Sequence, residues 1–473
     1  MSKDLALRRF LRRSLVGTEA VESREGSLRA LPDLVKLGLL LPLFLLTYGY
    51  LRYASAAWFH LDDFLFINDF HDGIRWDQLV HPQGFGRFVS INVYWNVTWN
   101  LFGREASLYF ALNFFLIVAT ALLLGRLVAK HYGAVAGLVG GVIYFALPNV
   151  IAGYTWLANS QHLLAHFFCA LFLFLYFRPE RQRFTAATIV ALEAVLVLAL
   201  LSNQLASALV VVPVVDLLVN REVRRRRTRW ILLGLIVVTV VALYFRVPDV
   251  NSGVYSTDLS SSTIQTNIDF YFGSTAVFVL GLVVALAGFT FAAWKRDALH
   301  ATLFLAGVAF VAPFLVLEFQ RYEHYVSLGF ACFFIGAWIA AYELLQSRVP
   351  QVVPVVALIM VLAAGAFGMS RLSDALETPI GADQRELVAQ MRDIVEANGP
   401  AVTKYCFTGP NVTNVRFRHR DNPVPSEWWG VGVGNAFRYF VDDSKKYWPE
   451  SLSGGCDRLI HIEGASLTEV PPS

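Results

Sequence analysis

The amino-acid sequence predicts an all-α, polytopic integral membrane protein. Of its 473 residues, 56% are hydrophobic and only 16% are charged, whereas soluble domains carry about 25% charged residues. Some long windows, residues 108–125 and 134–153 among them, contain no Asp, Glu, Lys or Arg at all. A helix needs roughly 20 mostly apolar residues to cross a bilayer, and on this basis we expect about eleven spans.

The apolar segments and the basic residues between them predict how the chain is threaded. We place the spans at residues 34–56, 107–129, 134–152, 160–177, 185–201, 204–220, 230–246, 271–293, 299–317, 325–345 and 351–369. With a cytoplasmic N-terminus, 21 of the 39 Lys and Arg residues lie in the N-terminal segment and in short cytoplasmic loops, as the positive-inside rule favours. The C-terminus is then outside, and we expect a bacterial inner (plasma) membrane protein whose site faces the periplasm or exterior.

This topology divides the chain into three parts. Residues 1–33 form a basic cytoplasmic segment, residues 34–369 the transmembrane domain, and residues 370–473 a small external α+β domain. The external loop at residues 57–106 is rich in aromatic residues and should form short helices along the membrane surface. Residues 247–270, with their serines and glycine, are typical of a mobile loop. The arginine run at 224–227 indicates contact with membrane lipid headgroups, and no nucleic-acid role is expected.

Cysteines are divided between the spans and the C-terminal part. Cys169 and Cys332 lie in apolar spans, whereas Cys406 and Cys456 lie in the polar C-terminal part. Only the second pair is a candidate for a disulfide.

An acidic pair, Asp62 and Asp63, follows the first span, next to Trp58, Phe59 and Phe64. A carboxylate beside apolar surface has its pKa raised, a second carboxylate raises it further, and a raised pKa suits a general base. Asp62 is our candidate for that base. The alternative is that one of the two aspartates only caps the following helix.

Other polar residues lie at the expected external ends of spans. They are Arg87, the segment at 159–162 and the segment at 321–325. One cavity could collect them together with the acidic pair. His162, His166 and Cys169 also have the spacing of a zinc site, although histidines that pack between helices are commoner.

These segments resemble the GT-C superfamily of polyprenyl-phosphate-sugar-dependent glycosyltransferases. An acidic pair in the first external loop is the family's pattern, and Asp62–Asp63 matches it. The chain is most similar to the bacterial relatives of the transmembrane and tetratricopeptide-repeat O-mannosyltransferases. Arg87–Phe88 resembles their Arg-Pro segment, with Phe88 in place of Pro, and Arg321–Tyr322 resembles their Arg-Tyr segment. The resemblance covers about residues 58–345. The C-terminal part shows no tetratricopeptide-like repeat.

The resemblance implies a GT-C-like fold and an inverting glycosyltransferase. Asp62 would be the base and Asp63 would position Asp62 or the acceptor. The donor phosphate would be bound by Arg321, Arg87, Tyr325 and His324, and the substrate cavity would be lined by His162, Asn159, Gln161 and Tyr322. The donor would be a polyprenyl-phosphate-linked sugar, and the acceptor a hydroxyl of a glycan, lipid or protein.

The sequence departs from the family pattern at two segments, so the roles that relatives' charged residues have there are not assigned to this chain. Ser160 and Gln161 replace the Arg and acidic residue that are common there, and Ser202-Asn203-Gln204 stands where relatives have Ser-Lys-Glu. The lost charges leave a divalent metal possible but unsupported, and no other cofactor is expected. The alternatives are a transporter or flippase for a lipid-linked glycan, and a non-catalytic membrane scaffold.

Overall fold

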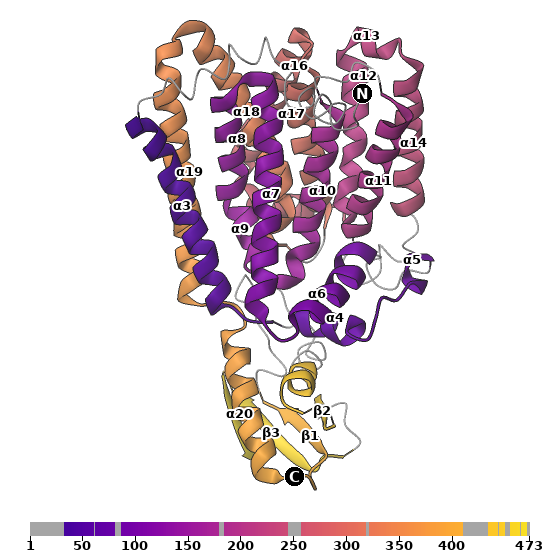
Figure 1. Cartoon of the computed structure of the whole chain (residues 1–473), viewed down its shortest axis with the longest axis vertical. Helices are drawn as coiled ribbons and strands as arrows, with labels where there is room; N and C mark the ends of the chain where they lie inside the picture. The colour runs from indigo at the N-terminus through magenta and orange to yellow at the C-terminus, as the bar shows by residue number, and fades with distance from the viewer. Residues whose placement is uncertain are drawn as a thin grey trace, which may run out of the picture.

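The structure, a computed structural model, is a bundle of long helices with a small mixed domain attached at one end (Figure 1). It describes residues 33–60, 62–80, 87–178, 184–244, 257–317, 321–409, 434–442, 444–449, 455–463 and 465–470. We call the end of the bundle next to the small domain the domain-facing end, and the opposite end the far end. Of the predicted N-terminal segment 1–33, only Asp33 lies within the described residues.

The chain is a mostly helical, multi-span membrane protein. By length and composition, six helices in the described part could each cross a membrane, or seven if one bent pair counts as a single span. A helix covers most of each of the eleven segments predicted to be spans. The helices of the bundle are α3 (Asp33–Ala56), α7 (Ala106–Tyr132), α8 (Ala134–Ala146), α9 (Pro148–Tyr154), α10 (Ser160–Tyr176), α11 (Ala186–Ser202), α12 (Val211–Val219), α14 (Arg227–Tyr244), α16 (Thr275–Lys295), α17 (Ala298–Val311), α18 (Ser327–Arg348) and α19 (Val353–Glu377). The short α13 (Arg221–Arg224) and η7 (Pro350–Val352) lie at the far end.

Glycines bring neighbouring helices of the bundle into close contact. A Cβ atom on Gly137 of α8 would lie 2.4 Å from the carbonyl oxygen of Gly125 on α7, and one on Gly329 of α18 would lie 2.9 Å from the carbonyl oxygen of Gly307 on α17. In a bilayer there is no hydrophobic driving force between apolar helices, so small residues that let backbones approach provide much of the packing.

Helices are interrupted at the domain-facing end. Leu147 is extended, with ψ 123°, because it precedes Pro148, and α8 and α9 consequently meet at 49°. Short helical turns also precede or follow the spans here, namely η2 (Leu157–Asn159), η3 (Gln204–Val210), η5 (Ala312–Val316) and η6 (Glu323–Val326). These turns direct side chains toward one another at this end of the bundle.

The described residues of the loop at 57–106 lie across the domain-facing end of the bundle (Figure 1). Within its described residues, the predicted short helices are α4 (Asp62–Phe70), α5 (Asp77–Val80), the π-helical turn η1 (Phe88–Val93) and α6 (Tyr94–Phe102). Helix α4 packs against α6, η1 and η2.

The expectation of a loop at residues 247–270 is wrong for its second half, where α15 (Ser261–Phe272) is a helix. Ser260 is its N-cap, and its hydroxyl accepts a hydrogen bond from the backbone N–H of Thr263 at 3.2 Å. The serines that indicate a loop in the sequence are therefore the start of a capped helix. Residues 245–256 lie outside the described residues.

The C-terminal domain is a four-stranded sheet with α20 (Ala382–Asn398) and a short helix at residues 434–440. Its strands are β1 (Lys404–Thr408), β2 (Lys446–Pro449), β3 (Arg458–Glu463) and β4 (Ser466–Val470), in the order β2-β1-β3-β4. β1 is parallel to both of its neighbours, and β4 is antiparallel to β3.

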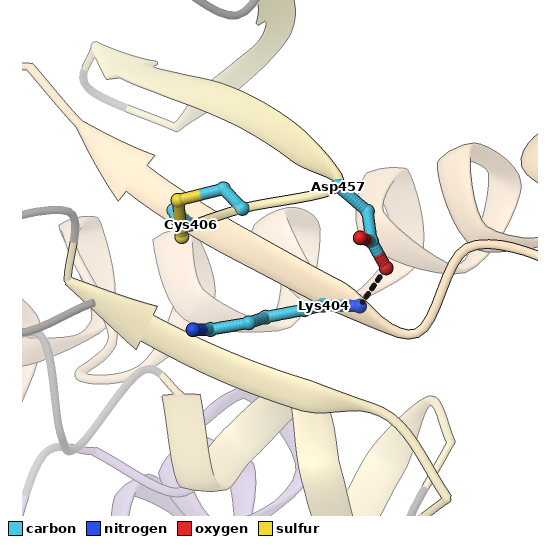
Figure 2. Close-up of a disulfide and its surroundings, with 4 residues drawn as sticks. Lys404, Cys406 and Asp457 are labelled. Atoms are coloured by element: carbon cyan, nitrogen blue, oxygen red, sulfur yellow. Dashed lines mark hydrogen bonds between the residues drawn. A yellow bond between two sulfur atoms is a disulfide. The ribbon is translucent and has the colours of Figure 1, made fainter. Parts of the chain in front are cut away.

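A disulfide joins Cys406 of β1 to Cys456, just before β3 (Figure 2). Next to it, the carboxylate of Asp457 accepts a hydrogen bond from the backbone N–H of Lys404 at 2.9 Å. The two central strands are thus tied together covalently as well as by their hydrogen-bond ladder.

We predict that Gly137→Ala destabilises the bundle, because the added methyl group would meet the backbone of α7. Overpacking of this kind costs about 1–3 kcal/mol, which should appear as a lower thermal unfolding temperature of the detergent-solubilised protein. The matched control is Gly281→Ala on α16, where an added Cβ meets no atom within 4 Å. Equal unfolding temperatures for the two variants would contradict the packing described.

Candidate active site

The acidic pair forms the first turn of α4, directly after the segment 57–60 that follows α3. Carboxylates at a helix N-terminus are favoured by the helix dipole and by the unpaired backbone N–H groups there. The local sequence thus explains why α4 begins at Asp62. The two carboxylates have different surroundings.

Asp63 is fully buried, at 0% exposure. Its Oδ2 atom accepts a hydrogen bond from the backbone N–H of His60 at 2.7 Å, and its own N–H donates to the His60 carbonyl at 2.8 Å. Burial raises the pKa of Asp63 well above its usual range, and the charge of Asp62 raises it further, against the N–H groups of His60 and Ala158. These two hydrogen bonds with His60 cap α4. Capping is the alternative to a general-base role that the sequence leaves open for one of the two aspartates.

Asp62 is partly exposed, and burial raises its pKa to about 6. Among the described residues, no group forms a hydrogen bond or ion pair with its carboxylate. When two neighbouring carboxylates have such different environments, they suit different chemical roles. Asp62 has the features of a proton acceptor, and Asp63 those of a structural group.

Arg87 lies immediately before η1, and its guanidinium donates a hydrogen bond to the side-chain oxygen of Gln161, which is 74 residues further along the chain. Gln161 belongs to the first turn of α10 and is 8% exposed. This contact joins the external loop to the bundle. It also places a permanently charged, partly exposed cation at the start of α10.

Three aromatic rings meet beside this cation. The ring centroid of His162 lies 4.9 Å from that of His324 and 5.2 Å from that of Tyr325. Asn159 and Asn203 approach the two histidines, with Nδ2 of Asn159 at 3.4 Å from Nδ1 of His324. The predicted cavity residues from α10 and η6, although more than 160 residues apart, therefore form one cluster.

Trp156 connects this cluster to the segment before the acidic pair. Its ring centroid is 6.1 Å from that of Tyr322 on one side and 6.1 Å from that of His60 on the other. Since α4 also packs on η2, which leads into α10, the acidic pair and the His162 cluster belong to one region of the domain-facing end.

Arg321 lies at the edge of this region, one residue before Tyr322. Its Nε atom donates to the side-chain oxygen of Asn267 on α15. Asn267 is itself buried and donates to the carbonyl oxygens of Leu315 and Leu317 at 2.9 and 2.8 Å. α15, which replaces the expected loop, is thus the element that orients Arg321.

The part of the chain that the structure describes contains no group of three or more His, Cys, Asp and Glu residues arranged to hold a metal ion. The zinc alternative for His162, His166 and Cys169 is therefore not supported. His166 lies instead 3.1 Å from the Tyr144 hydroxyl and 3.3 Å from the Ser327 hydroxyl.

Several residues of this region were not identified from the sequence. Asn267 and Trp156 orient site residues, and Tyr53, Tyr94 and Tyr109 lie near the Asp63 carboxylate. Tyr53, Trp156 and Asn267 lie outside residues 57–106; for Tyr94 and Tyr109 the available signal was the gathering of aromatic residues in that segment. It indicates an interface but does not show which carboxylate is enclosed.

Comparison with known proteins relates the fold to a solved structure. No protein-family model matches the chain, and no curated protein matches it. The crystal structure of ArnT from Cupriavidus metallidurans bound to undecaprenyl phosphate is similar, with a TM-score of 0.50 and 13% sequence identity over 87% of this chain and 85% of that chain. ArnT in the apo state gives a TM-score of 0.48 at 14% identity, covering 88% of this chain and 85% of that chain. The chain therefore has an ArnT-like fold over most of its length.

We predict that Asp63→Ala lowers the free energy of unfolding by about 1–3 kcal/mol, because the His60 N–H loses its acceptor. Asp63→Asn keeps an acceptor oxygen in place and should recover most of this loss. Thermal unfolding of the purified variants measures both effects. An Asp63→Ala protein as stable as the wild type would show that the carboxylate is not structural.

Proposed function

We propose that the protein is an inverting glycosyltransferase that moves a sugar from a polyprenyl-phosphate donor to a hydroxyl of a lipid, glycan or protein acceptor. The observation that carries the proposal is the grouping at the domain-facing end of an unpaired carboxylate, Asp62, with the Arg87–Gln161 and His162–His324 cluster. The site would face the periplasm or exterior, with about eleven spans, a cytoplasmic N-terminus and an external C-terminal domain.

Asp62 is the proposed general base. It would take the proton of the acceptor hydroxyl while the hydroxyl oxygen attacks the anomeric carbon of the sugar. The bond from that carbon to the phosphate oxygen breaks, and its electron pair leaves with the polyprenyl phosphate. Attack on the face opposite the leaving phosphate gives inversion. The proposed role of Asp63 is to fix the direction of α4 and so the place of Asp62.

The leaving phosphate requires positive charge and hydrogen-bond donors. Arg87 and Arg321 are the proposed cations, since a guanidinium remains charged when partly buried and can donate two bonds to a phosphate. His324 and Tyr325 are the proposed additional donors, and His162, Asn159, Gln161 and Tyr322 would line the cavity for the sugar.

Two independent similarities support this proposal. The sequence segments resemble the GT-C superfamily, and the fold resembles that of ArnT, whose crystal structure contains undecaprenyl phosphate. A polyprenyl-phosphate ligand is therefore the first to test. The sugar, the acceptor and the involvement of a divalent metal are left open.

The second candidate is a transporter or flippase for a lipid-linked glycan. Transporters commonly place ionisable groups and broken helices near the bilayer midplane. Here the interrupted helices and the polar cluster lie at one end of the bundle. That distribution favours an enzyme that works at the membrane surface.

We predict that Asp62→Asn lowers the transfer rate by about 100-fold or more while leaving donor binding intact, because it removes only the base. By contrast, Arg87→Ala or Arg321→Ala should weaken binding of undecaprenyl phosphate by roughly tenfold or more. Arg348→Ala, at an exposed position at the far end, is the matched control. The measurements are single-turnover transfer and lipid-phosphate binding by purified protein. Wild-type turnover in Asp62→Asn and in Arg321→Ala would reject the proposal.

We also predict an acidic limb in the pH dependence of transfer. The base must be ionised, and burial raises the pKa of Asp62 to about 6, so the rate should rise as the pH increases through this value and level off above it. The small residual rate of Asp62→Asn should lack this limb. A wild-type rate that is constant from well below this pKa to neutral pH would exclude Asp62 as the base.

A further inference from the structure

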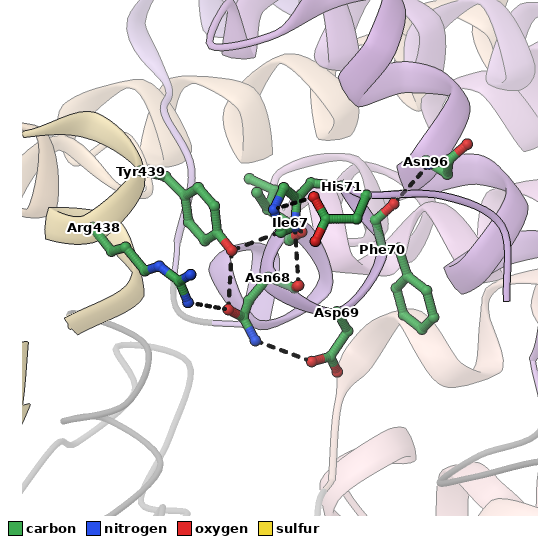
Figure 3. Close-up of polar contacts among 9 residues, drawn as sticks. Ile67, Asn68, Asp69, Phe70, His71, Asn96, Arg438 and Tyr439 are labelled. Atoms are coloured by element: carbon green, nitrogen blue, oxygen red, sulfur yellow. Dashed lines mark hydrogen bonds and ion pairs between the residues drawn. The ribbon is translucent and has the colours of Figure 1, made fainter. Parts of the chain in front are cut away.

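The C-terminal domain contacts the helix that carries the acidic pair (Figure 3). The hydroxyl of Tyr439, in the short helix 434–440, donates to the side-chain oxygen of Asn68 on α4 at 3.0 Å and lies 3.4 Å from Nδ1 of His71. Arg438 reaches the same Asn68 oxygen at 3.5 Å. The rings of Tyr439 and His71 are 4.9 Å apart. Asn68 and His71, at the end of α4, thus contact the other domain in addition to their bonds within their own segment, where Nδ1 of His71 lies 3.1 Å from the Ile67 carbonyl oxygen.

Phe440, the next residue, fills the space around the start of α4. Its ring centroid lies 5.0 Å from that of Trp58, 5.5 Å from Phe59 and 5.9 Å from Phe64. Phe440 is 6% exposed. It therefore packs against the residues on both sides of the acidic pair in the sequence.

The segment between α19 and α20, which leads into the C-terminal domain, also contacts the residues just before the acidic pair. The backbone N–H of Trp58 donates to the carbonyl of Ile380 at 3.0 Å, and the N–H of Ile380 donates to the hydroxyl of Tyr53 at 3.2 Å. Gly381 has φ +80°, and a Cβ there would lie 2.5 Å from the carbonyl oxygen of Phe59. The close approach of the two backbones at this point requires glycine.

α4 needs such support because it is short. It has nine residues, and isolated helices of this length are marginal in water. Its orientation determines where the Asp62 carboxylate lies, and small displacements of a catalytic group lower rates strongly.

We propose that the C-terminal domain is a positioning part of the transferase site, with Tyr439 and Phe440 as the residues that hold α4. This inference rests on the proposed role of Asp62. Tyr439 is a positioning residue that acts through Asn68 and α4, and the domain would be required for efficient transfer even if it never contacts a substrate.

The test compares two Tyr→Phe variants of the full-length protein. Tyr439→Phe removes the hydroxyl that binds Asn68 and keeps the ring against His71. Tyr447→Phe is the matched control, because its hydroxyl is buried in the same domain and has no hydrogen-bond partner among the described residues. Hydrogen exchange of the α4 amides, measured in nanodiscs, should be several-fold faster in Tyr439→Phe and unchanged in Tyr447→Phe.

Transfer kinetics give the second readout. Tyr439→Phe should lower kcat by about three- to tenfold, as expected for one lost hydrogen bond, with little change in KM for the donor. Its acidic limb should shift to lower pH, because a less firmly held α4 exposes the Asp62 carboxyl to water. A domain that matters only for stability would leave the pH limb in place.

A variant on the bundle side keeps the test decisive if Tyr439→Phe folds poorly. Asn68→Ala leaves the C-terminal domain intact, and its effect on kcat should not add to that of Tyr439→Phe, since both remove the same contact. Additive effects, or unchanged exchange in α4, would overturn the inference. If the wild type transfers no polyprenyl-phosphate sugar, the proposed function fails, and the exchange data still decide whether the domain holds α4.

Discussion

Asp63 has a buried carboxylate at the boundary between the bundle and the C-terminal domain. This group constrains the helix ends and segments that are packed around it. A buried polar group in such a place is unfavourable unless it is hydrogen-bonded. The His60 N–H meets this need, so residue 60 is held next to the first turn of α4. The segment before α4 is itself held in place by two contacts of Trp58. Its backbone N–H donates to the Ile380 carbonyl, and its ring packs against Phe440. One buried group thus links the end of α3, the start of α4 and the attachment of the C-terminal domain.

The same constraint separates the roles of the two aspartates. Because Asp63 is directed inward and bonded to the backbone, Asp62, one residue earlier on the helix, points elsewhere and stays partly exposed. The capping interpretation and the base interpretation, which are alternatives in the sequence, are therefore compatible. The capping interpretation fits Asp63, and the base interpretation is the role proposed for Asp62.

Much of the fold follows from the sequence because the bilayer imposes a simple rule on composition. Long uncharged segments predict helices, and a helix lies over most of each such segment. The sequence does not predict contacts between segments that depend on three-dimensional packing, such as Arg87 with Gln161 or Tyr439 with Asn68. α15 was missed for a local reason, since its polar composition resembles a loop and only the Ser260 cap indicates a helix.

Within the C-terminal part, the central strands β1 and β3 coincide with the apolar segments at 402–407 and 459–462. β4, Ser-Leu-Thr-Glu-Val, has only exposed and half-buried side chains, and β2 has only four residues, so neither carries the apolar pattern of a buried strand. Edge strands are commonly short and polar because this limits pairing with other chains. Their identity therefore depends on the neighbouring strand more than on their own residues.

Half-buried charges are paired at the domain-facing end as well as at the far end, since Arg371 forms an ion pair with Glu323. At the far end, buried and half-buried charges are paired: Arg229 lies 3.0 Å from Asp216 and stacks on Phe184, and Lys295 lies 2.9 Å from Glu343. Between the ends, Glu193 of α11 accepts a hydrogen bond from Thr239 of α14 at 3.1 Å. Charges that only stabilise a fold are expected to be paired, since an unpaired one lowers stability. Asp62, at the domain-facing end, has no such partner among the described residues. An unpaired carboxylate with a raised pKa, next to the C-terminal domain, is the observation on which the proposed role of Asp62 as a general base rests.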